Sequence, residues 1–277
     1  MNWRLTANIL SLAVLLIMFI GLLTPIDSSL PIWVFIDRLG DAEGYIVLTL
    51  AIYFLIDAWL GYFSLLILLV SGVSNIWLKD LFRIPRPDDS LVEAEGYSFP
   101  SGHAQTSSTF WSSIYYLTRD RVVAIIGIPV VAIISVSRLV LKVHYPLDVA
   151  AGLVIGLLIG YGVKYVVKFY RETWSLKISL HIILGSLALI LYLGSGYLTL
   201  VKIGGVAFGM VLHPILHREV RYPFRTRLYL YILYLIPAFL LTRLASDAST
   251  TFIVFLLIGA GAPFMLYRLG ERLSKMI

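Results

Sequence analysis

The sequence predicts an all-α polytopic membrane protein, with a six-span helical core followed by about four extra C-terminal transmembrane helices. Of the 277 residues, 59% are apolar and only 14% are charged. A water-soluble domain with this composition would expose far more apolar surface than such domains do. The apolar residues also gather in repeated runs of about 20, the length that an α-helix needs to cross a bilayer. We therefore expect about nine or ten spans.

The first spans form the expected core. The first apolar run, residues 7–24, follows Arg4 and has no small-x-small cleavage site before Pro25, so we interpret it as a retained signal anchor. The more polar residues 25–44 are expected to lie along the membrane interface. The other core spans are expected at residues 45–56, 62–78, 101–118, 122–136 and about 147–167.

The remaining spans form the expected C-terminal extension. They lie near residues 178–193, 197–212, 228–241 and 251–266. We therefore divide the chain into a catalytic core, residues 1–172, and an extension of unknown role, residues 173–277.

The charged residues indicate topology and exclude nucleic acid as a partner. The net charge is +6, but the basic residues lie in loops between apolar runs and form no continuous patch with interleaved aromatics. Cytoplasmic loops are enriched in Lys and Arg, so alternating spans with a cytoplasmic N-terminus explain most of them. The inner residues are then Arg4, Arg119, Arg121, Lys164, Lys168, Arg171, Lys177, Arg218, Arg221, Arg225, Arg227, Arg268, Arg272 and Lys275. This predicts a multi-pass protein of the cell membrane.

Three short motifs lie at the ends of predicted spans, all on the outer, extracytoplasmic face. Residues 79–87 read K-D-L-F-R-I-P-R-P, residues 100–103 read P-S-G-H, and residues 137–148 read S-R-L-V-L-K-V-H-Y-P-L-D. Ser101 suits the N-cap of a helix, and Pro146 suits the first position of another. A helix N-terminus presents unpaired N–H groups and a positive dipole, which favour an anion.

The side chains in these motifs suit a phosphoryl group. Lys79, Arg86 and Arg138 supply cations, and the two arginines can grip phosphoryl oxygens with two hydrogen bonds each. Ser101 and the backbone N–H of Gly102 add neutral donors. We expect these five residues to bind the phosphate of a substrate.

Two histidines and a carboxylate can carry the reaction itself. His144 and Asp148 are four residues apart, close enough for the carboxylate to accept one imidazole N–H and direct the other nitrogen at phosphorus. His144 is then the candidate nucleophile, and His103 can protonate the leaving oxygen. Because the cations already neutralise the phosphoryl oxygens, we expect no metal and no cofactor. The chain has no cysteine, which excludes disulfides, thiolate metal sites and cysteine nucleophiles.

Together the motifs fit K-x6-R-P, P-S-G-H and S-R-x5-H-x3-D at every defined position. In this the chain resembles the type 2 phosphatidic acid phosphatase superfamily over roughly residues 45 to 170. The resemblance implies the same roles: His144 as nucleophile, Asp148 as the residue that orients it, and His103 as the acid. It also implies a membrane phosphatase that hydrolyses a lipid phosphate or polyprenyl diphosphate at the outer face through a phosphohistidine.

Four alternative functions stay open. The C-terminal extension resembles the layout of glucose-6-phosphatases and sphingosine-phosphate phosphatases, which favours a sugar phosphate or a sphingoid phosphate as substrate. A lipid phosphotransferase would pass the phosphoryl group from His144 to a second hydroxyl. The alternative that is not an enzyme is a binding or transport protein for phosphate lipids.

Other features have simpler interpretations. Arg83 and Lys142 are expected at the lipid interface, and a solvated loop explains Asp88, Asp89, Glu93 and Glu95 better than a metal site does. His213 and His217 have an i, i+4 spacing but are expected to be structural, and His181 is expected at a span end.

Glycines recur at four-residue spacing in two predicted spans. Gly152, Gly156 and Gly160 would let a neighbouring helix approach closely, either inside one subunit or between two subunits of a homo-oligomer. Gly205 and Gly209 form a similar pair and are also expected to serve helix packing.

Overall fold

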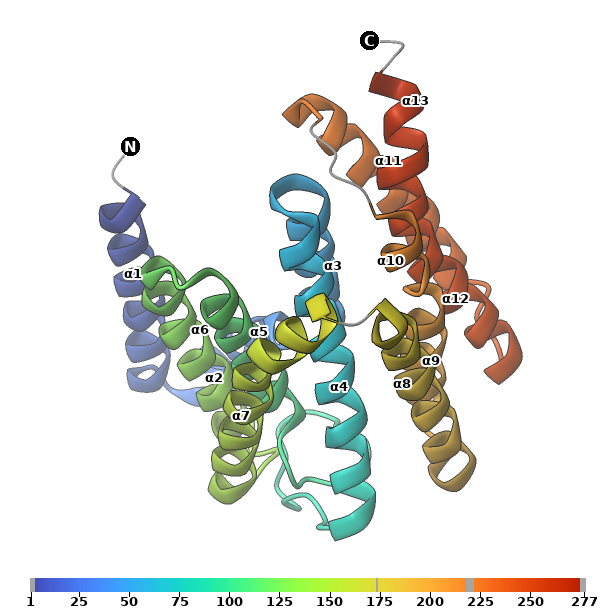
Figure 1. The fold of residues 1–277 in the computed structure, drawn as a ribbon. Coiled ribbons are helices and arrows are strands. Elements are labelled where there is room, and N and C mark those ends of the chain that lie inside the picture. Colours follow the sequence, from blue (N-terminus) through green and yellow to red (C-terminus); the bar gives the residue numbers. More distant parts are fainter. Residues whose placement is uncertain (1–2, 173, 218–221, 275–277) are drawn as a thin grey trace. The chain divides into compact units, whose positions relative to one another are not determined.

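The computed structural model describes residues 3–172, 174–217 and 222–274, and every regular element in these ranges is helical (Figure 1). The prediction of an all-α fold is confirmed. Up to residue 172 the helices are α1 (Trp3–Leu23), α2 (Ile26–Leu39), α3 (Ala42–Ala51), the π-helix η1 (Ile52–Ile56), α4 (Ala58–Phe82), α5 (Gly102–Thr118), α6 (Arg121–Val140) and α7 (Pro146–Glu172). Beyond it they are α8 (Trp174–Ser195), α9 (Leu198–Gly209), α10 (Leu212–Leu216), α11 (Phe224–Thr242), α12 (Ala248–Phe264), the π-helix η2 (Met265–Leu269) and α13 (Gly270–Ser274).

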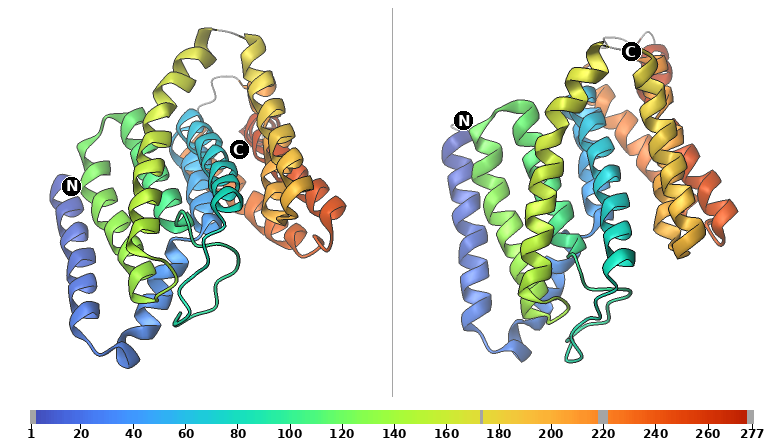
Figure 2. Two further views of the ribbon diagram at one scale, coloured as in Figure 1. Left: turned by 90° about the horizontal axis from the view of Figure 1, so that it is seen from below. Right: turned by 60° about the horizontal axis from the view of Figure 1, so that its bottom comes forward.

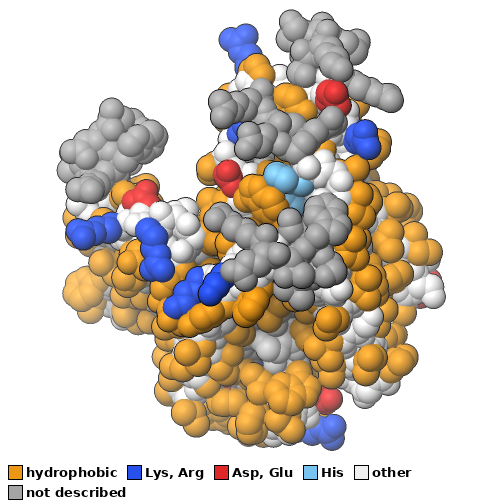
Figure 3. Space-filling model, viewed as in Figure 1, with side chains coloured by type: hydrophobic (Ala, Val, Ile, Leu, Met, Phe, Trp, Pro, Cys, Tyr) orange, Lys and Arg blue, Asp and Glu red, His pale blue; other side chains and the backbone are white. Residues whose placement is uncertain are grey.

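The helices are those of a multi-pass membrane protein. Within the described ranges, 8 helices are long and apolar enough to cross a membrane, or 9 if the pair Ile26–Leu39 and Ala42–Ile56, bent by 54°, forms one span. Large apolar side chains are exposed along them, and apolar atoms cover most of the face shown in Figure 3. Arg218, Arg221 and Lys275, part of the predicted inner basic set, lie outside the described residues.

Two expected spans are not among the eight helices: residues 45–56 qualify only together with α2, which was expected along the interface, and α5 does not qualify. α5 has 17 residues and is rich in serine and threonine. Most of its polar side chains are buried, and the hydroxyls of Ser108, Ser112 and Ser113 donate to carbonyls one turn earlier in the same helix. A helix whose polar groups are satisfied and whose neighbours are other helices needs no lipid-like composition. This is why α5 differs from the spans around it.

The described helices form two compact units that do not follow the boundary expected at residue 172. Unit 1 comprises Met1–Val47 and Ser74–Lys164, and unit 2 comprises Leu48–Val73 and Tyr165–Ile277. In unit 1, α6 packs against α1, α2 and α5 (Figure 2). The functional division of the chain at residue 172 stays a prediction.

The glycine stripe of α7 lies against α5 within unit 1. A Cβ atom added at Gly152 would lie 2.5 Å from the carbonyl oxygen of Ser101 and 3.3 Å from the Cβ of Ala104. Gly156 and Gly160 face the next two turns of α5. The stripe therefore serves packing inside one subunit, and it offers no support for a homo-oligomer.

We expect Gly156→Ala to lower both the stability and the activity of the protein. Its new methyl group would clash with the carbonyl oxygen of Gln105 and with the hydroxyl of Ser108. Overpacking of this kind costs about 1–3 kcal/mol, and α5 and α7 would have to separate. The matched control is Gly162→Ala on the same helix, where no atom lies within 4 Å of the added Cβ. Thermal unfolding in detergent should separate the two variants, and equal melting temperatures would contradict the expectation.

The second glycine pair also serves packing, here within unit 2. A Cβ atom at Gly205 would lie 2.7 Å from the carbonyl oxygen of Phe252 in α12, and Gly209 faces the next turn of α12. In α12, Gly259 packs against Val206 of α9, and a Cβ atom added at Gly259 would lie 2.5 Å from the carbonyl oxygen of Val206. These glycines let the backbones of α9 and α12 touch, as expected from the sequence.

Candidate active site

The three motifs lie at the ends of helices, and all of their predicted site residues belong to unit 1. They are Lys79 in the last turn of α4, Arg86 in the loop after it, Ser101 at the N-cap of α5, Gly102 and His103 in the first turn of α5, Arg138 near the end of α6, His144 just before α7, and Asp148 in its first turn. As predicted, α7 begins at Pro146.

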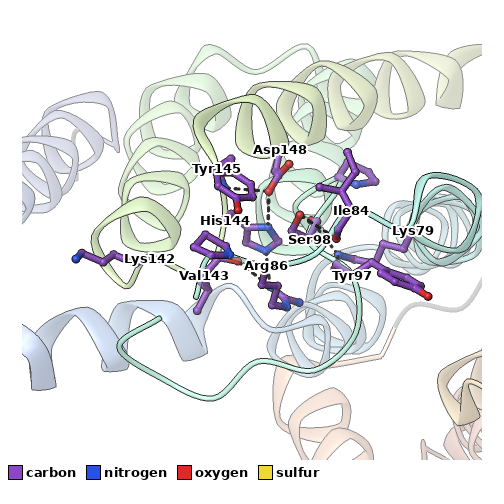
Figure 4. Close-up of polar contacts among 12 residues, drawn as sticks. Lys79, Ile84, Arg86, Tyr97, Ser98, Lys142, Val143, His144, Tyr145 and Asp148 are labelled. Carbon is purple, nitrogen blue, oxygen red and sulfur yellow. Dashed lines mark hydrogen bonds and ion pairs between the residues drawn. The ribbon is translucent and has the colours of Figure 1, made fainter. Parts of the chain in front are cut away.

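His144 and Asp148 form a buried pair. The Nδ1 atom of His144 lies 3.3 Å from Oδ2 of Asp148, and the same oxygen accepts the backbone N–H of Tyr145 at 2.9 Å (Figure 4). The other ring nitrogen, Nε2, lies 3.2 Å from Nη1 of Arg86. An arginine can only donate and a carboxylate only accepts. His144 is therefore the neutral tautomer with its proton on Nδ1 and its lone pair on Nε2.

The surroundings of His144 hold it in this neutral form. The pKa of His144 is lowered to about 2. Burial is the largest cause, and the positive charges of Arg138, Arg86 and Lys79 and the nearby His103 lower it further. Cations disfavour the charged imidazolium, and so does removal from water. The fold thus brings all three predicted cations and both predicted histidines into electrostatic range of one another.

A backbone hydrogen bond joins the second motif to the third. The N–H of Ser101 donates to the carbonyl oxygen of Asp148 at 3.0 Å. Ser101 has the extended backbone of an N-cap residue, but its hydroxyl makes no capping hydrogen bond. The N-cap position was predicted correctly, whereas the side-chain hydrogen bond of a cap is absent.

Three buried polar atoms of this site have no hydrogen-bond partner within the described ranges. Two are Oγ of Ser101, a fully buried residue, and Nε of Arg138, which is 4% exposed. The third, Nε2 of His103, lies 3.1 Å from Oδ1 of Asp41 without forming a hydrogen bond to it. Arg138 uses Nη1 to pair with Asp37. This leaves the edge formed by Nε and Nη2, which is the edge that binds two oxygens of one phosphate or carboxylate. Buried polar groups are nearly always hydrogen-bonded, so these donors indicate a binding site for an anion.

The other two cations bind backbone carbonyls. Lys79 Nζ donates to the carbonyl oxygens of Tyr97 and Ser98, the latter at 3.1 Å. Arg86 donates to the carbonyl oxygen of Val143 at 2.9 Å (Figure 4). It also donates to the carbonyl oxygen of Glu95 at 2.7 Å. Sequence reasoning expected Arg86 to grip a phosphate with two hydrogen bonds. In this arrangement Arg86 instead ties the first motif to the loop that carries His144, and it would have to exchange partners to bind a phosphate.

Sequence reasoning missed two carboxylates at the end of α2. Oδ1 of Asp41 lies 3.1 Å from Nε2 of His103, and Asp37 pairs with Arg138. Both lie in the stretch that the sequence placed along the membrane interface. The sequence feature that could have identified them is a pair of carboxylates four residues apart in an apolar segment, on either side of Gly40.

The charged residues near the motifs pair with their own neighbours. Lys142 pairs with Asp89 at 2.6 Å, and both are exposed. Arg83 folds back onto its own helix end, donating to the carbonyl oxygen of Asp80 at 2.9 Å. Among the described residues, no group of three or more His, Cys, Asp and Glu side chains is placed to hold a metal ion.

The three remaining histidines lie in unit 2 among aromatic residues. Each bonds a tyrosine hydroxyl: His181 bonds Tyr62 at 2.7 Å, His213 bonds Tyr53 at 3.0 Å, and His217 bonds Tyr267 at 2.9 Å. His213 also stacks on Tyr62, with ring centroids 4.0 Å apart. This is the structural role expected for His213 and His217. His181 is fully buried beside α4.

Comparison with known proteins gives the same family as the motifs. The model of the PAP2 superfamily matches residues 59–172, which contain all three motifs. The chain is 30% identical over 117 residues to phosphatidylglycerophosphatase B of Bacillus subtilis, covering 39% of this chain and 58% of that protein. It is 34% identical over 108 residues to undecaprenyl-diphosphatase of Sulfolobus acidocaldarius, covering 39% of this chain and 48% of that protein.

The matches to these relatives are partial, since the chain spans about half the length of each. A solved structure also matches, a transmembrane PAP2-type phosphatidylglycerolphosphate phosphatase from Bacillus subtilis. It is 26% identical, with a TM-score of 0.48, and the match covers 60% of this chain and 94% of that one. Residues 59–172 of this chain, which contain the His144–Asp148 pair, therefore match the PAP2 superfamily.

Proposed function

We propose that this protein is an integral membrane phosphatase that hydrolyses a lipid phosphate or polyprenyl diphosphate through a phosphohistidine intermediate at His144. The observation that carries this proposal is the pair of buried donors without a protein partner in the described structure, Ser101 Oγ and Arg138 Nε. They belong to the same site as a neutral histidine whose lone pair is oriented by a carboxylate. A binding site for an anion next to a neutral, oriented nucleophile suits phosphoryl transfer.

In the first step, the lone pair on Nε2 of His144 attacks phosphorus, and the bond from phosphorus to the leaving oxygen breaks. Arg86 Nη1 leaves Nε2 and donates to a phosphoryl oxygen instead. Arg138 donates through Nε and Nη2, and Ser101 through its hydroxyl. His103 gives a proton to the leaving oxygen.

In the second step, water attacks phosphorus and the bond to Nε2 breaks. The neutral His103 takes the proton that water loses, so the enzyme returns to its starting state. Asp148 faces Nδ1–H throughout and stabilises the positive charge that His144 acquires when it carries the phosphoryl group. The three cations supply the electrostatic stabilisation, so we propose that turnover needs no metal.

The outer, extracytoplasmic face is the proposed location of the site. Support comes from the distribution of Lys and Arg, because the positive-inside rule favours a cytoplasmic N-terminus with the motifs outside. The exposed loop residue Glu93 allows a test. We expect Glu93→Cys, the single cysteine in such a variant, to react with an impermeant thiol reagent added to intact cells. Labelling only after lysis would show that the topology is the reverse of the one proposed.

The proposed substrate class is a phosphorylated lipid. The names of both relatives refer to lipids, a phosphatidylglycerophosphate and an undecaprenyl diphosphate. The substrate phosphate must reach a buried site at the ends of membrane helices, which a lipid can do without leaving the bilayer.

The direct test is phosphate release by the purified protein in EDTA. The substrates are a polyprenyl diphosphate, a phosphatidylglycerophosphate, a phosphatidate, a sphingoid phosphate and glucose 6-phosphate. We expect release from one or more of the lipids and none from the sugar. Release from glucose 6-phosphate that added lipid phosphate does not inhibit would overturn the substrate class. If no substrate releases phosphate, a phosphotransferase or a binding protein becomes the better explanation.

The pH dependence of kcat/KM should respond to the charge of Arg86. Because this cation lowers the pKa of His144, its removal should raise that pKa toward the ordinary value of about 6.5. The nucleophile is active when neutral, so activity falls as pH drops through its pKa. We therefore expect Arg86→Gln to move the acid limb of kcat/KM to higher pH, measured with the same substrate as the wild type. Arg83→Gln, which removes a cation that bonds Asp80 near the end of α4, should leave the acid limb in place.

A further inference from the structure

The turn between α2 and α3 lies against the first turn of α5 and the end of α6. Asp41, in this turn, approaches Nε2 of His103 to 3.1 Å, and Asp37 approaches the same nitrogen to 3.8 Å. Asp37 also pairs with Arg138. Both carboxylates precede residues 59–172, the part of the chain that matches the family model. This turn thus brings two acidic side chains to the site from outside the matched segment.

The approach of this turn to His103 is close and specific. A Cβ atom at Gly40 would lie 2.6 Å from Cδ2 of His103 and 2.7 Å from Cγ2 of Ile134. Gly40 has an ordinary right-handed conformation, with φ −85°, so proximity alone excludes a side chain here. Trp33 and Ile36 anchor α2 because both are buried. The contact between the turn and His103 is therefore part of the packed structure.

The geometry of the imidazole ring then determines which nitrogen is available. The edge formed by Cδ2 and Nε2 faces the turn, because Cδ2 abuts Gly40 and Nε2 abuts Asp41. Nδ1 lies across the ring from this edge and faces away from the turn. A carboxylate that accepts one N–H of a histidine fixes both the orientation of the ring and the place of its protons.

We propose that Asp41 is a positioning residue for His103, an inference that rests on the phosphatase function proposed above. A rotation of the half-exposed Asp41 side chain from its 3.1 Å contact lets its carboxylate accept the Nε2–H of His103, and the proton that reaches the leaving oxygen comes from Nδ1. As the bond from phosphorus to the leaving oxygen breaks, that oxygen takes the Nδ1 proton, and His103 becomes neutral with Nε2–H still bonded to Asp41. In the hydrolytic step, Nδ1 accepts the proton released by the attacking water.

Half of the Asp41 side chain is exposed, so the ion pair contributes little to stability. This property makes the proposal testable, because Asp41→Asn should fold like the wild type. The matched control is Glu43→Gln, which removes the same charge from an exposed residue two positions away. Asp41→Glu restores the carboxylate and should recover part of any lost activity.

The decisive measurement is kcat/KM for two substrates that differ in their leaving groups. An alkyl phosphate releases an alkoxide that needs a proton, whereas 4-nitrophenyl phosphate releases a stable phenolate. Loss of a residue that orients a catalytic group typically costs about 10- to 100-fold. We expect Asp41→Asn to show this loss for the alkyl phosphate and at most a small loss for the aryl phosphate, with Glu43→Gln unchanged on both. If the protein accepts only one of the two substrates, the role of Asp41 is tested on that substrate alone. The test is then the loss of kcat/KM in Asp41→Asn and its recovery in Asp41→Glu.

Two results would overturn the proposal: full activity in Asp41→Asn, or an equal loss for both leaving groups. Failure of the phosphatase function itself looks different, because the wild-type protein would then release no phosphate from any substrate. A lower melting temperature in Asp41→Asn together with an equal loss on both substrates would assign Asp41 a structural role.

Discussion

His144→Ala is expected to reduce phosphate release by about 10⁴-fold or more. Removing the nucleophile of a covalent mechanism leaves only the contribution of substrate binding and charge stabilisation, and losses of this order are typical. The variant should retain its fold, because a smaller side chain replaces a ring whose hydrogen bonds lie within the site itself. The loss should appear in kcat for every substrate that the wild type accepts.

The intermediate gives a second readout for the same variant. Brief reaction of the wild type with a ³²P-labelled substrate, followed by denaturation, should leave label on the protein in an acid-labile, base-stable form, as expected for a phosphohistidine. His144→Ala should carry no label. Lys142→Ala, an exposed residue two positions away that pairs with Asp89, is the control and should be labelled as the wild type is. Label that persists in His144→Ala would refute the assignment of the nucleophile.

Asp148→Asn is expected to cost about 10³-fold or more in kcat. Its carboxylate keeps the proton of His144 on Nδ1 and so leaves the lone pair on Nε2 toward phosphorus. In the triad of serine proteases, the corresponding exchange of aspartate for asparagine costs about 10⁴-fold. An amide is a weaker acceptor, and it cannot stabilise the positive charge of a phosphorylated imidazole. If its NH₂ group turns toward the ring, the proton moves to Nε2 and blocks attack.

Two observations distinguish this effect from a general loss of structure. Asp148 also accepts the N–H of Tyr145, a bond that the oxygen of asparagine can keep, so the start of α7 should remain in place. Asp89→Asn removes an exposed carboxylate from the neighbouring loop and should leave kcat unchanged. Wild-type turnover in Asp148→Asn would show that His144 needs no orienting carboxylate.

Much of the candidate site follows from local sequence. Ser101 and Pro146 mark helix starts that the structure has at those positions, because N-cap and first-turn preferences depend on a few adjacent residues. The pairing of His144 with Asp148 follows from their spacing around one helix start. These relations need no information from distant parts of the chain.

Other features depend on contacts between segments far apart in the sequence. The glycine stripe of α7 could have served one subunit or two, and only the position of α5 assigns it to one. The polar composition of α5 makes sense only because α6 and α7 cover it. Residues 48–73 pack with residues beyond 165, so the compact units cross the division expected at residue 172.

The sequence by itself determined the class of the fold, the three motifs and the chemical identity of the groups that meet in the site, because these follow from composition and short spacings. Only the tertiary structure decided how those groups are used. It bonded Arg86 to His144, left donors of Ser101 and Arg138 without a protein partner among the described residues, and brought Asp41 to His103. The physical reason is that a side chain's hydrogen bonds depend on which helix ends the packing brings together. Helical periodicity and hydropathy carry no information about those neighbours.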